Sequence, residues 1–552
     1  MRTRLLLPSS AALMAAMLFP AAPQLASAKD RAPPALTGQV TSEAEGAMEG
    51  VVISAKKADS TVTVSVISDA QGRYQFPSDR LAAGKYSVKI RAAGYNLAAP
   101  VTADVADEQT TTVDLRLRKT KNIASQMSNG EWMMSLPGSE DQKAFLLNCV
   151  GCHTLERIVR SNHDAEQWMQ TIVRMNGYAP VSQPIKPQRM LDPARSGQPE
   201  RFRKQAEYLA SINLSDVSQW EYPLKILARP TGRATRVIIT EYDMPRPTTE
   251  PHDVIVDAQG AVWYSDFGEL FISKFDPKTL KLTEYPVKEF KPGAPVGNLS
   301  LEFDKGGTLW FDTMFQGALG NLDPRTEQIK YYPLAAEYND VRVQLNFVGL
   351  RHDVDGKVWT KSVGTQDIYR LDLATGAWER FQPLKELAGG PYGIYQVISD
   401  SQNNLWMAEF QKGHIGKIDA KSGKVSWFPL PTDNARARRM NIDDQDRILV
   451  TEYRGNKIAL FDTKTEKVTE WPLPPHTYPY RAAVDKNGEL WTGGMHTDRA
   501  VRLDPKTGET VEYLLPRETN MRTVFVDNST TPVTFWVGNN HGAALVKVEP
   551  LD

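Results

Sequence analysis

The segment from Cys149 to His153 reads Cys-Val-Gly-Cys-His, and its spacing has the most specific chemical meaning in the chain. In a C-x-x-C-H motif the two thiols add to the vinyl groups of a c-type haem and the histidine ligates the iron. Three other interpretations are open: a disulfide, a thioredoxin-like redox pair, or half of a zinc site. A zinc site needs two more nearby ligands, and only His163 is close; a redox pair lies in a βαβ context. Ser139 instead can cap a helix over 140–148 that leads into the motif, which favours covalent haem c with a proximal histidine.

Cys149 and Cys152 are the only cysteines in 552 residues, so no other thiol competes for them. Residues 1–28 have the features of a secretory signal peptide: Arg2 and Arg4, an apolar alanine-rich stretch and an Ala-Ser-Ala cleavage site. Haem attachment after export predicts a periplasmic location and an exported redox partner.

Charge and hydropathy exclude two classes of partner. The formal net charge is -1, whereas a chain that binds nucleic acid has a basic excess. The mean hydropathy is -0.41, and no stretch after the signal peptide approaches the apolar length of a membrane span. We therefore expect no transmembrane segment in the mature chain.

Residues 34–119 predict a β domain. Apolar and polar residues alternate with period two, as in Thr61–Val66, and residues 69–72 form a turn before a new strand. The segment resembles the carboxypeptidase regulatory-like domain, a small transthyretin-like β-sandwich. It contains no cysteine or histidine, so we expect an accessory or docking module.

Residues 120–230 change to helical periodicity around the C-x-x-C-H motif. A last helix is expected near residues 202–212, and its Tyr-Leu pair at 208–209 resembles the C-terminal helix that packs across the haem in class I cytochromes c. This resemblance predicts a small cytochrome c domain whose distal iron ligand is a methionine. Met175 is the preferred ligand because its helix ends at a glycine, and Met190 is the alternative. The candidates considered are Met169, Met175 and Met190.

An aspartate-headed turn recurs through residues 231–552 at intervals of about 45 residues, the length of four short strands. These turns begin at Asp276, Asp323, Asp372, Asp419, Asp462 and Asp504. A tryptophan, once replaced by leucine, marks each unit: Trp263, Trp310, Trp359, Trp406, Leu449, Trp491 and Trp536. The repeat predicts a seven-bladed β-propeller. Residues 240–244 resemble a last strand but precede the first blade, so we expect them to pair with the blade of Trp536 and close the ring.

The repeat resembles the streptogramin (virginiamycin B) lyase family, which opens the ester of a cyclic depsipeptide by elimination. The resemblance extends over residues 235–552, and Glu250-Pro251-His252 matches the family's Glu-Pro-His at the start of an innermost strand. By this resemblance His252 is the catalytic base and Glu250 helps to hold a magnesium ion. Asp266 would stand in for a further glutamate of the metal site.

Other central positions depart from that family. Where the family has a second histidine in the neighbouring blade, this chain has Arg522, and the equivalent positions of the two preceding blades hold Tyr480 and Arg438. We expect these side chains to converge with Glu250 and His252 on one pocket at the axial opening. Two arginines favour an anionic or phenolic ligand and would lower the pKa of the histidine, keeping it neutral. Further histidines are interpreted as exposed loop residues: His414, His476, His496 and His541.

Together these segments predict a multidomain, mainly β chain with an N-terminal β-sandwich, a small α-helical cytochrome c domain and a C-terminal seven-bladed β-propeller. Three functions stay open. In the first, the propeller binds a small organic substrate and the haem passes electrons on. The second is a metal-dependent lyase, and the third is a non-catalytic, haem-bearing scaffold. The haem motif and the missing second histidine favour the first function, whereas Glu250 and His252 favour the second.

Overall fold

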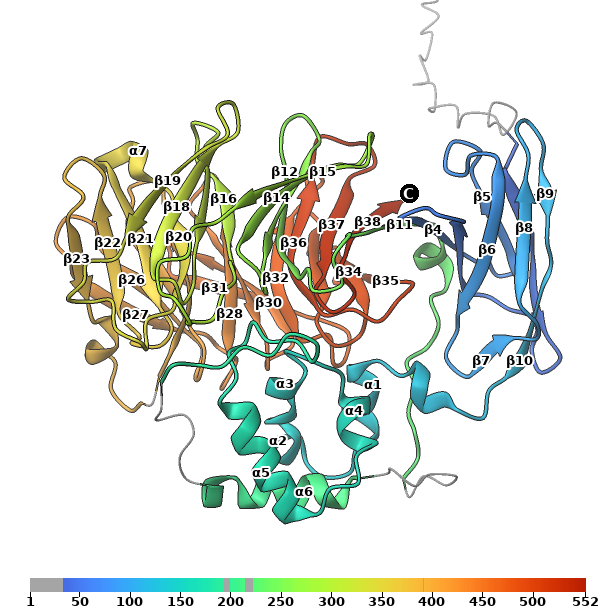
Figure 1. Cartoon of the computed structure of the whole chain (residues 1–552), viewed down its shortest axis with the longest axis horizontal. Coiled ribbons are helices and arrows are strands. Elements are labelled where there is room, and N and C mark those ends of the chain that lie inside the picture. The colour runs from blue at the N-terminus through green and yellow to red at the C-terminus, as the bar shows by residue number, and fades with distance from the viewer. Residues whose placement is uncertain (1–32, 193–198, 214–221, 391) are drawn as a thin grey trace, which may run out of the picture.

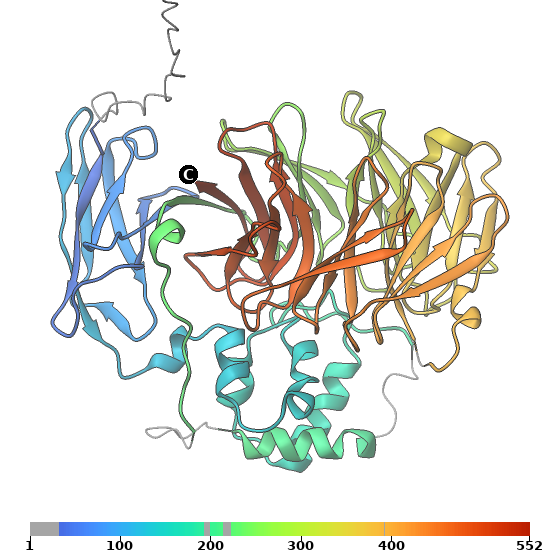
Figure 2. The same cartoon turned by 180° about the vertical axis from the view of Figure 1, so that it is seen from behind.

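Figure 1 shows the computed structural model of the chain, which describes residues 33–192, 199–213, 222–390 and 392–552. A ring of β-sheets forms the largest part, a helical region lies against one end of the ring, and a β-rich N-terminal part stands at its side. Figure 2 shows the same arrangement from behind. The expected signal peptide, residues 1–28, lies outside the described residues. Within the described ranges, no helix has the length and apolar character needed to cross a membrane.

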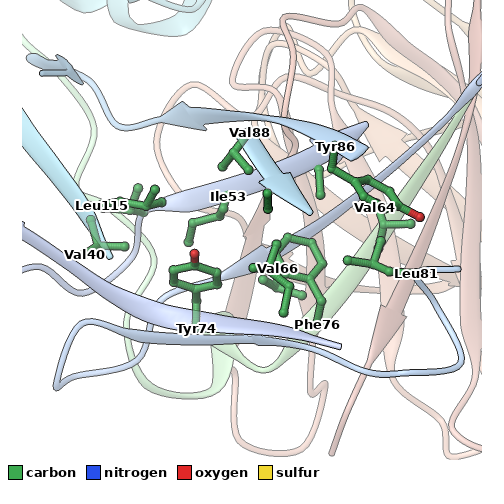
Figure 3. Close-up of a cluster of buried hydrophobic side chains, with 14 of the residues drawn as sticks. Val40, Ile53, Val64, Val66, Tyr74, Phe76, Leu81, Tyr86, Val88 and Leu115 are labelled. Carbon is green, nitrogen blue, oxygen red and sulfur yellow. The ribbon is translucent and has the colours of Figure 1, made fainter. Parts of the chain in front are cut away.

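The N-terminal strands form two sheets around one apolar core, which confirms the expected β-sandwich. Alternation places every second residue inside: in β6, Tyr86 and Val88 are buried while Lys85 and Ser87 are exposed. Figure 3 shows the side chains that meet in this core. The strands are β1 (Leu36–Ser42), β2 (Gly46–Ala47), β3 (Val52–Lys57), β4 (Val62–Ile67), β5 (Arg73–Phe76), β6 (Gly84–Arg91), β7 (Tyr95–Leu97), β8 (Val101–Val105), β9 (Thr111–Thr112) and β10 (Leu115–Lys119).

The segment around the C-x-x-C-H motif is helical, as expected. The predicted helix over 140–148 is present as α2 and α3, and Ser139 caps α2 through a reciprocal hydrogen-bond pair with Gln142. Phe145 meets Tyr208 of α6 edge to face, with ring centres 5.9 Å apart, so α6 packs against the residues that precede the motif. The elements are η1 (Ile123–Gln126), α1 (Asn129–Ser135), α2 (Glu140–Lys143), α3 (Leu146–Cys149), α4 (Leu155–Val159), α5 (Ala165–Asn176), η3 (Pro199–Phe202), α6 (Arg203–Ser211) and η4 (Gly232–Thr235).

The ring consists of blades in which four antiparallel strands follow each other from the axis outward. The first three blades are β12 (Pro251–Val256), β13 (Val262–Asp266), β14 (Phe271–Asp276), β15 (Lys281–Pro286); β16 (Leu301–Phe303), β17 (Leu309–Asp312), β18 (Ala318–Asp323), β19 (Gln328–Pro333); and β20 (Leu345–Gly349), β21 (Lys357–Ser362), β22 (Ile368–Asp372), β23 (Trp378–Phe381). The next three are β24 (Ile394–Ser399), β25 (Leu405–Glu409), β26 (His414–Ile418), β27 (Val425–Pro429); β28 (Ala437–Ile442), β29 (Ile448–Glu452), β30 (Lys457–Asp462), β31 (Lys467–Pro472); and β32 (Pro479–Val484), β33 (Leu490–Gly494), β34 (Arg499–Leu503), β35 (Thr510–Leu514). Two short helices, α7 (His352–Asp355) and η5 (Pro383–Glu386), lie in connections of this part.

The seventh blade closes the ring with a strand from the start of the propeller. Its C-terminal strands are β36 (Met521–Asp527), β37 (Thr534–Asn539) and β38 (Ala544–Pro550), and its fourth strand is β11 (Val237–Asp243). β11 pairs antiparallel with β38 along its whole length. The innermost strand β36 contacts both β32 and β12, so the sixth, seventh and first blades are neighbours. The predicted closure is confirmed.

β11 also joins the propeller to the sandwich. Its other edge pairs with β4, so the seventh blade and one sandwich sheet form a single eight-stranded sheet. The ion pairs Lys56–Asp243 at 2.5 Å and Arg91–Asp498 at 2.6 Å reinforce the junction. The expected accessory module is therefore a fixed extension of the seventh blade, and it covers the edge that β11 would otherwise expose.

In four blades the tryptophan of the repeat is bonded to an aspartate in the turn that precedes it, which is a different aspartate from those that head the turns from Asp276 to Asp504. In the first blade, Asp257 accepts hydrogen bonds from backbone amides of its own turn through Oδ1 and from Trp263 Nε1, 2.8 Å away, through Oδ2. The same Asp-to-Trp bond, at 2.9 to 3.0 Å, recurs in three other blades. Trp263 stacks on Tyr285 of the outermost strand. One aspartate thus fixes both a turn and an indole, which explains why these residues repeat together.

Candidate functional site

A cluster of buried side chains lies at the end of the propeller axis that faces the helical region. Ring symmetry brings the innermost strands together there: β12 supplies His252, β28 supplies Arg438, β32 supplies Tyr480 and β36 supplies Arg522. Each of these four residues is less than one tenth exposed. The contacts of Tyr480 with His252, Arg438 and Arg522 join the four side chains in one cluster.

His252 is held at both ring nitrogens. Nδ1 lies 2.8 Å from Asp253 Oδ1, and Nε2 lies 3.2 Å from Tyr480 Oη. Asp253 is in turn bonded by Arg439, 2.6 Å from Oδ2, and by the hydroxyl of Thr523 on Oδ1. An aspartate with these partners stays ionised and can only accept hydrogen bonds, so the neutral imidazole carries its proton on Nδ1 and accepts at Nε2.

Burial lowers the pKa of His252 to about 4, because the charged imidazolium loses its hydration in the interior. Asp253 opposes this effect, whereas Arg522 and Arg439 add to it. Burial is thus the main reason that His252 is neutral, and the arginines that add to it are Arg522 and Arg439 rather than the expected pair Arg522 and Arg438.

Arg438 lies among aromatic rings. Its guanidinium carbon is 4.2 Å from the ring centre of Tyr453, 4.5 Å from that of Tyr480 and 5.0 Å from that of Tyr395. Such cation–π contacts stabilise a buried guanidinium more weakly than a carboxylate would. Nη1 lies 3.4 Å from the sulfur of Met495, and Nε has no hydrogen-bond partner.

The backbone of the C-x-x-C-H motif rests directly on this cluster. Arg522 donates to the carbonyl of Gly151 at 3.1 Å, and His541 Nε2 lies 3.3 Å from the same oxygen. Asn520 donates to the carbonyl of Val150 at 3.0 Å. The motif and the central residues of the propeller, predicted from separate segments, therefore form one site.

The motif contains the donor groups that covalent haem attachment needs, two free thiols and an imidazole. Both cysteines are free thiols, and burial raises the pKa of Cys149 to about 12 and that of Cys152 to about 11. His153 Nδ1 lies 3.0 Å from the carbonyl of Thr154, which orients the ring and leaves Nε2 for a metal. Burial lowers the pKa of His153, so it is neutral, as a ligand must be. These donors fit a c-type haem.

Met175 lies toward the exposed side of α5, with 42% of its surface accessible. Met190 is partly buried against the apolar cluster that contains Phe267 and Met314. The positions of the two side chains do not favour Met175 over Met190 as the distal haem ligand, and the identity of this ligand stays a prediction.

Glu250 and Asp266 do not fit a magnesium site. Asp266 is engaged on one oxygen by the backbone amides of Glu250 and Gly268 and on the other by Arg246. Burial and the neighbouring Asp266 raise the pKa of Glu250 well above its usual value, which opposes the ionised form that Mg²⁺ requires of its oxygen ligands. Among the described residues, no group of three histidine, cysteine or acidic side chains is placed to hold a metal. Glu250 still belongs to the site, since it acts electrostatically on Cys152 and interacts with Arg522.

The sequence analysis did not identify several of the central residues. Asp253 and Arg439 directly follow His252 and Arg438, so their position next to predicted residues was the available signal. Tyr395 donates a hydrogen bond to Tyr480 at 2.9 Å, and its place at the start of β24 matches the register of the other central residues.

None of the four histidines interpreted as exposed is exposed: His414, His476 and His541 are partly buried, and His496 is buried. His496 is 1% exposed, and its Nε2 lies 2.7 Å from the hydroxyl of Tyr453. His541 contacts the motif, as described above, and burial lowers its pKa to about 4. Both lie in turns that the helical region covers, and the sequence of the propeller alone could not show this cover.

Comparisons with known proteins match the N-terminal and C-terminal parts of the chain, and neither family match includes residues 119–280, which contain the C-x-x-C-H motif. Residues 35–118 match the carboxypeptidase regulatory-like domain, and residues 281–476 and 401–550 match the virginiamycin B lyase family. Among solved structures, a streptogramin B lyase is 21% identical over 58% of this chain and 99% of its own, with a TM-score of 0.49. A virginiamycin B lyase from Staphylococcus aureus is 21% identical over 57% and 99%, with a TM-score of 0.48. No curated protein sequence matches the chain. The protein thus carries a carboxypeptidase regulatory-like domain at its N-terminal end and a virginiamycin B lyase-like propeller at its C-terminal end.

Proposed function

We propose that this protein is an exported, periplasmic c-type haem protein that takes electrons from a small anionic or phenolic organic substrate at the axial end of its propeller. One observation carries the proposal: Arg522, His541 and Asn520 of the propeller bond the backbone carbonyls inside the C-x-x-C-H motif. A haem on this motif would lie at the mouth of the axial cluster, where a bound substrate meets it.

Cys149 and Cys152 would hold the haem through thioethers, and His153 would ligate its iron, with Met175 or Met190 as the distal ligand. When bound, the haem supplies a one-electron acceptor. The protein's own residues bind the substrate and exclude water from it. An exported redox partner would then receive the electron.

The charges of the cluster support an anionic or phenolic substrate. Among the described residues, neither Arg438 nor Arg522 forms an ion pair with a carboxylate, and both are buried. A buried guanidinium without an anion carries a large desolvation cost, which an oxyanion of the substrate would offset. The aromatic rings around Arg438 provide the apolar contact surface of a typical small-molecule site.

A lyase is the second candidate, because the propeller matches the virginiamycin B lyase family and retains Glu250 and His252. Two observations weigh against it. Both nitrogens of His252 are already bonded inside the protein, and the motif loop lies on the arginine that faces the axial mouth. A cyclic depsipeptide would have to displace this loop to reach the base.

The test begins with the absorption spectrum and haem content of the protein matured in a periplasm. We expect one covalent haem per chain, and we expect the Cys149→Ser, Cys152→Ser double variant to lack it. The variants Met175→Ala and Met190→Ala then identify the distal ligand, because the substitution that removes it also removes the absorption band specific to methionine ligation.

Substrate-dependent reduction of the haem by a panel of small phenols and carboxylates is expected to be strongly reduced in Arg522→Gln. The exposed Arg325 provides a matched control, since Arg325→Gln removes the same charge from a blade turn. Magnesium-dependent opening of a depsipeptide ester, without haem reduction, would overturn the proposal in favour of the lyase. Haem reduced by none of the panel, together with no lyase activity, would favour the non-catalytic scaffold.

A further inference from the structure

One arginine of the N-terminal sandwich holds the connection between the sixth and seventh blades. Arg91, the last residue of β6, donates from Nη1 to the backbone carbonyls of Leu515 and Arg517, both at 2.9 Å. From Nη2 it donates to Oδ2 of Asp498 at 2.6 Å. Leu515 and Arg517 belong to the connection of residues 515–520 between β35 and β36. All three bonds cross from the sandwich to the propeller, so the sandwich helps to fix the course of this connection.

Asp498 extends the restraint along the same connection. Its Oδ1 accepts from the backbone amide of Thr519 at 3.0 Å, and its own carbonyl accepts from the amide of Leu515 at 2.9 Å. Asp498 is 1% exposed, and a buried carboxylate is stable only when a cation or several donors compensate it. Arg91 supplies this cation. Every second residue from 515 to 519 is therefore held by Arg91 or by Asp498.

The residues that bind the C-x-x-C-H motif come next in the sequence. Asn520, which follows Thr519, donates to the carbonyl of Val150 at 3.0 Å. Arg522 lies two residues further and donates to the carbonyl of Gly151 at 3.1 Å. Each planar peptide unit leaves only two rotatable bonds per residue, so a displaced Thr519 moves Asn520 with it.

We propose that Arg91 is a positioning residue, which holds the 515–520 connection in the course that lets Asn520 and Arg522 bind the C-x-x-C-H motif. The carboxypeptidase regulatory-like domain thereby takes part in building the axial site, in addition to covering the edge of the seventh blade. Arg91 acts on the motif only through the propeller. The inference goes beyond the proposed function and does not depend on it, because it rests on hydrogen bonds within the chain.

The position of Arg91 suits this role, since three parts of the chain meet beside it. A cavity of about 20 Å³ is lined there by Arg91, by Gln126 and Glu131 of the helical region, and by Arg499 of the sixth blade, among others. The backbone turn that contains Asp498 also contacts the helical region, because the carbonyl of His496 accepts from the amide of Gly130 at 2.6 Å. A shift of this turn would thus reach the helical region as well.

Two contacts of the connection do not come from the sandwich. Asn539 donates to the carbonyl of Glu518 at 3.1 Å, and the side chain of Arg517 pairs with Glu241 at 2.9 Å. We therefore expect loss of the Arg91 side chain to weaken the contacts with the motif without abolishing them.

The carbonyl of Gly151 gives a direct reading of this effect. Gly151 and Cys152 form the only Gly-Cys pair of the sequence, so labelling with [1-¹³C]glycine and ¹⁵N-cysteine yields a single carbonyl NMR signal. The protein is matured in a periplasm and kept reduced, so that a methionine-ligated haem is diamagnetic. The chemical shift of a carbonyl carbon decreases when a hydrogen bond to its oxygen is lost. We expect a decrease in Arg522→Ala and a smaller decrease in Arg91→Gln.

A second sandwich arginine provides the matched control. Arg80 crosses the same junction to Glu549 of β38, at 3.1 and 3.2 Å, and bonds this strand rather than the 515–520 connection. Arg80→Gln should therefore retain the parental Gly151 signal. Arg91→Lys keeps the charge but lacks the planar fork of donors, so its signal should lie between those of Arg91→Gln and the parent. In an Arg522→Ala background, Arg91→Gln should add a smaller shift than it causes alone, because part of its effect passes through Arg522.

A parental Gly151 signal in Arg91→Gln would overturn the positioning role. An equal shift in Arg80→Gln would overturn it too, because the effect would then be a general one of the junction. If Arg91→Gln does not fold, comparison of Arg91→Lys with Arg80→Lys decides the question in the same way. The signal reports the polypeptide alone, so the expected shifts in a chain that attaches no haem would retain the role of Arg91 and refute the proposed function. Substrate-dependent haem reduction in a protein whose Gly151 signal ignores Arg91 would do the reverse.

Discussion

Acidification is expected to destabilise the propeller through His252, and the structure gives the size of the effect. Burial holds the pKa of His252 at about 4 in the folded protein, against 6.5 when the side chain is in water. At pH 7 the ring is neutral in both states. As the pH falls below 6.5, His252 becomes protonated in the unfolded chain, whereas in the folded chain it stays neutral until about pH 4.

The stability contributed by the neutral ring is thus complete above pH 6.5 and is lost on the way down to pH 4. At about 1.4 kcal/mol for each pH unit, the difference between the two pKa values corresponds to a loss of about 3 kcal/mol. His541, whose pKa is also about 4, should contribute a loss of similar size.

Urea unfolding followed by tryptophan fluorescence between pH 7.5 and pH 4.5 measures this loss. His252→Gln cannot bind the proton in either state, so we expect its free energy of unfolding to fall by about 2.5 kcal/mol less than that of the parent between pH 7.5 and pH 4.5. Tyr331→Phe, remote from the axis, should retain the parental pH dependence. Parallel curves for His252→Gln and the parent would refute the argument that burial keeps this ring neutral.

Three further predictions concern stability and docking. Arg439→Met should lower the free energy of unfolding, measured in urea, by about 3–5 kcal/mol, because it leaves Asp253 buried without its cation. The double variant Arg439→Met, Asp253→Asn should recover part of this loss. Additive losses for the two substitutions would contradict the pairing. Deleting residues 237–243 should expose the edges of both the seventh blade and the sandwich, so limited proteolysis should cut both parts faster; parental resistance would argue against ring closure by this strand. Arg522→Ala removes a charged hydrogen bond to Gly151, worth about 1.5–3 kcal/mol, and amide exchange of the motif should accelerate accordingly, whereas unchanged exchange would place the docking elsewhere.

The propeller was predictable because its repeat is a local physical unit. An aspartate that bonds both its own turn and a tryptophan leaves the same two residues at the same spacing in blade after blade. The closing strand was predictable as well, because a strand pattern before the first blade has one free edge to pair with. The partner of its other edge was not predictable. β11 pairs with β4, more than a hundred residues away, and neither strand has a sequence pattern that identifies the other as its partner.

The site was predictable only in part, for the same reason. Register within the repeat gave His252, Arg438, Tyr480 and Arg522 their common place, because equivalent positions of blades meet at the axis. Register could not show that the C-x-x-C-H motif rests there, since this contact lies between segments with different periodicities. It also could not show that Asp266 is occupied by Arg246, which removes it from the expected metal site.

Arg522 connects the departure from the lyase pattern with the arrangement of the site. It stands at the position where the resembling family has a second histidine, and in this chain it bonds the carbonyl of Gly151. A histidine there has a shorter side chain and, when neutral, a single N–H donor, whereas a guanidinium has several donors and a permanent charge. The same replacement that weakens the elimination chemistry therefore fastens the C-x-x-C-H motif over the axial mouth. If this is its role, Arg522→His should loosen the motif in amide exchange without creating ester elimination. A variant that gains magnesium-dependent elimination would instead mean that the lyase machinery is complete but for this residue.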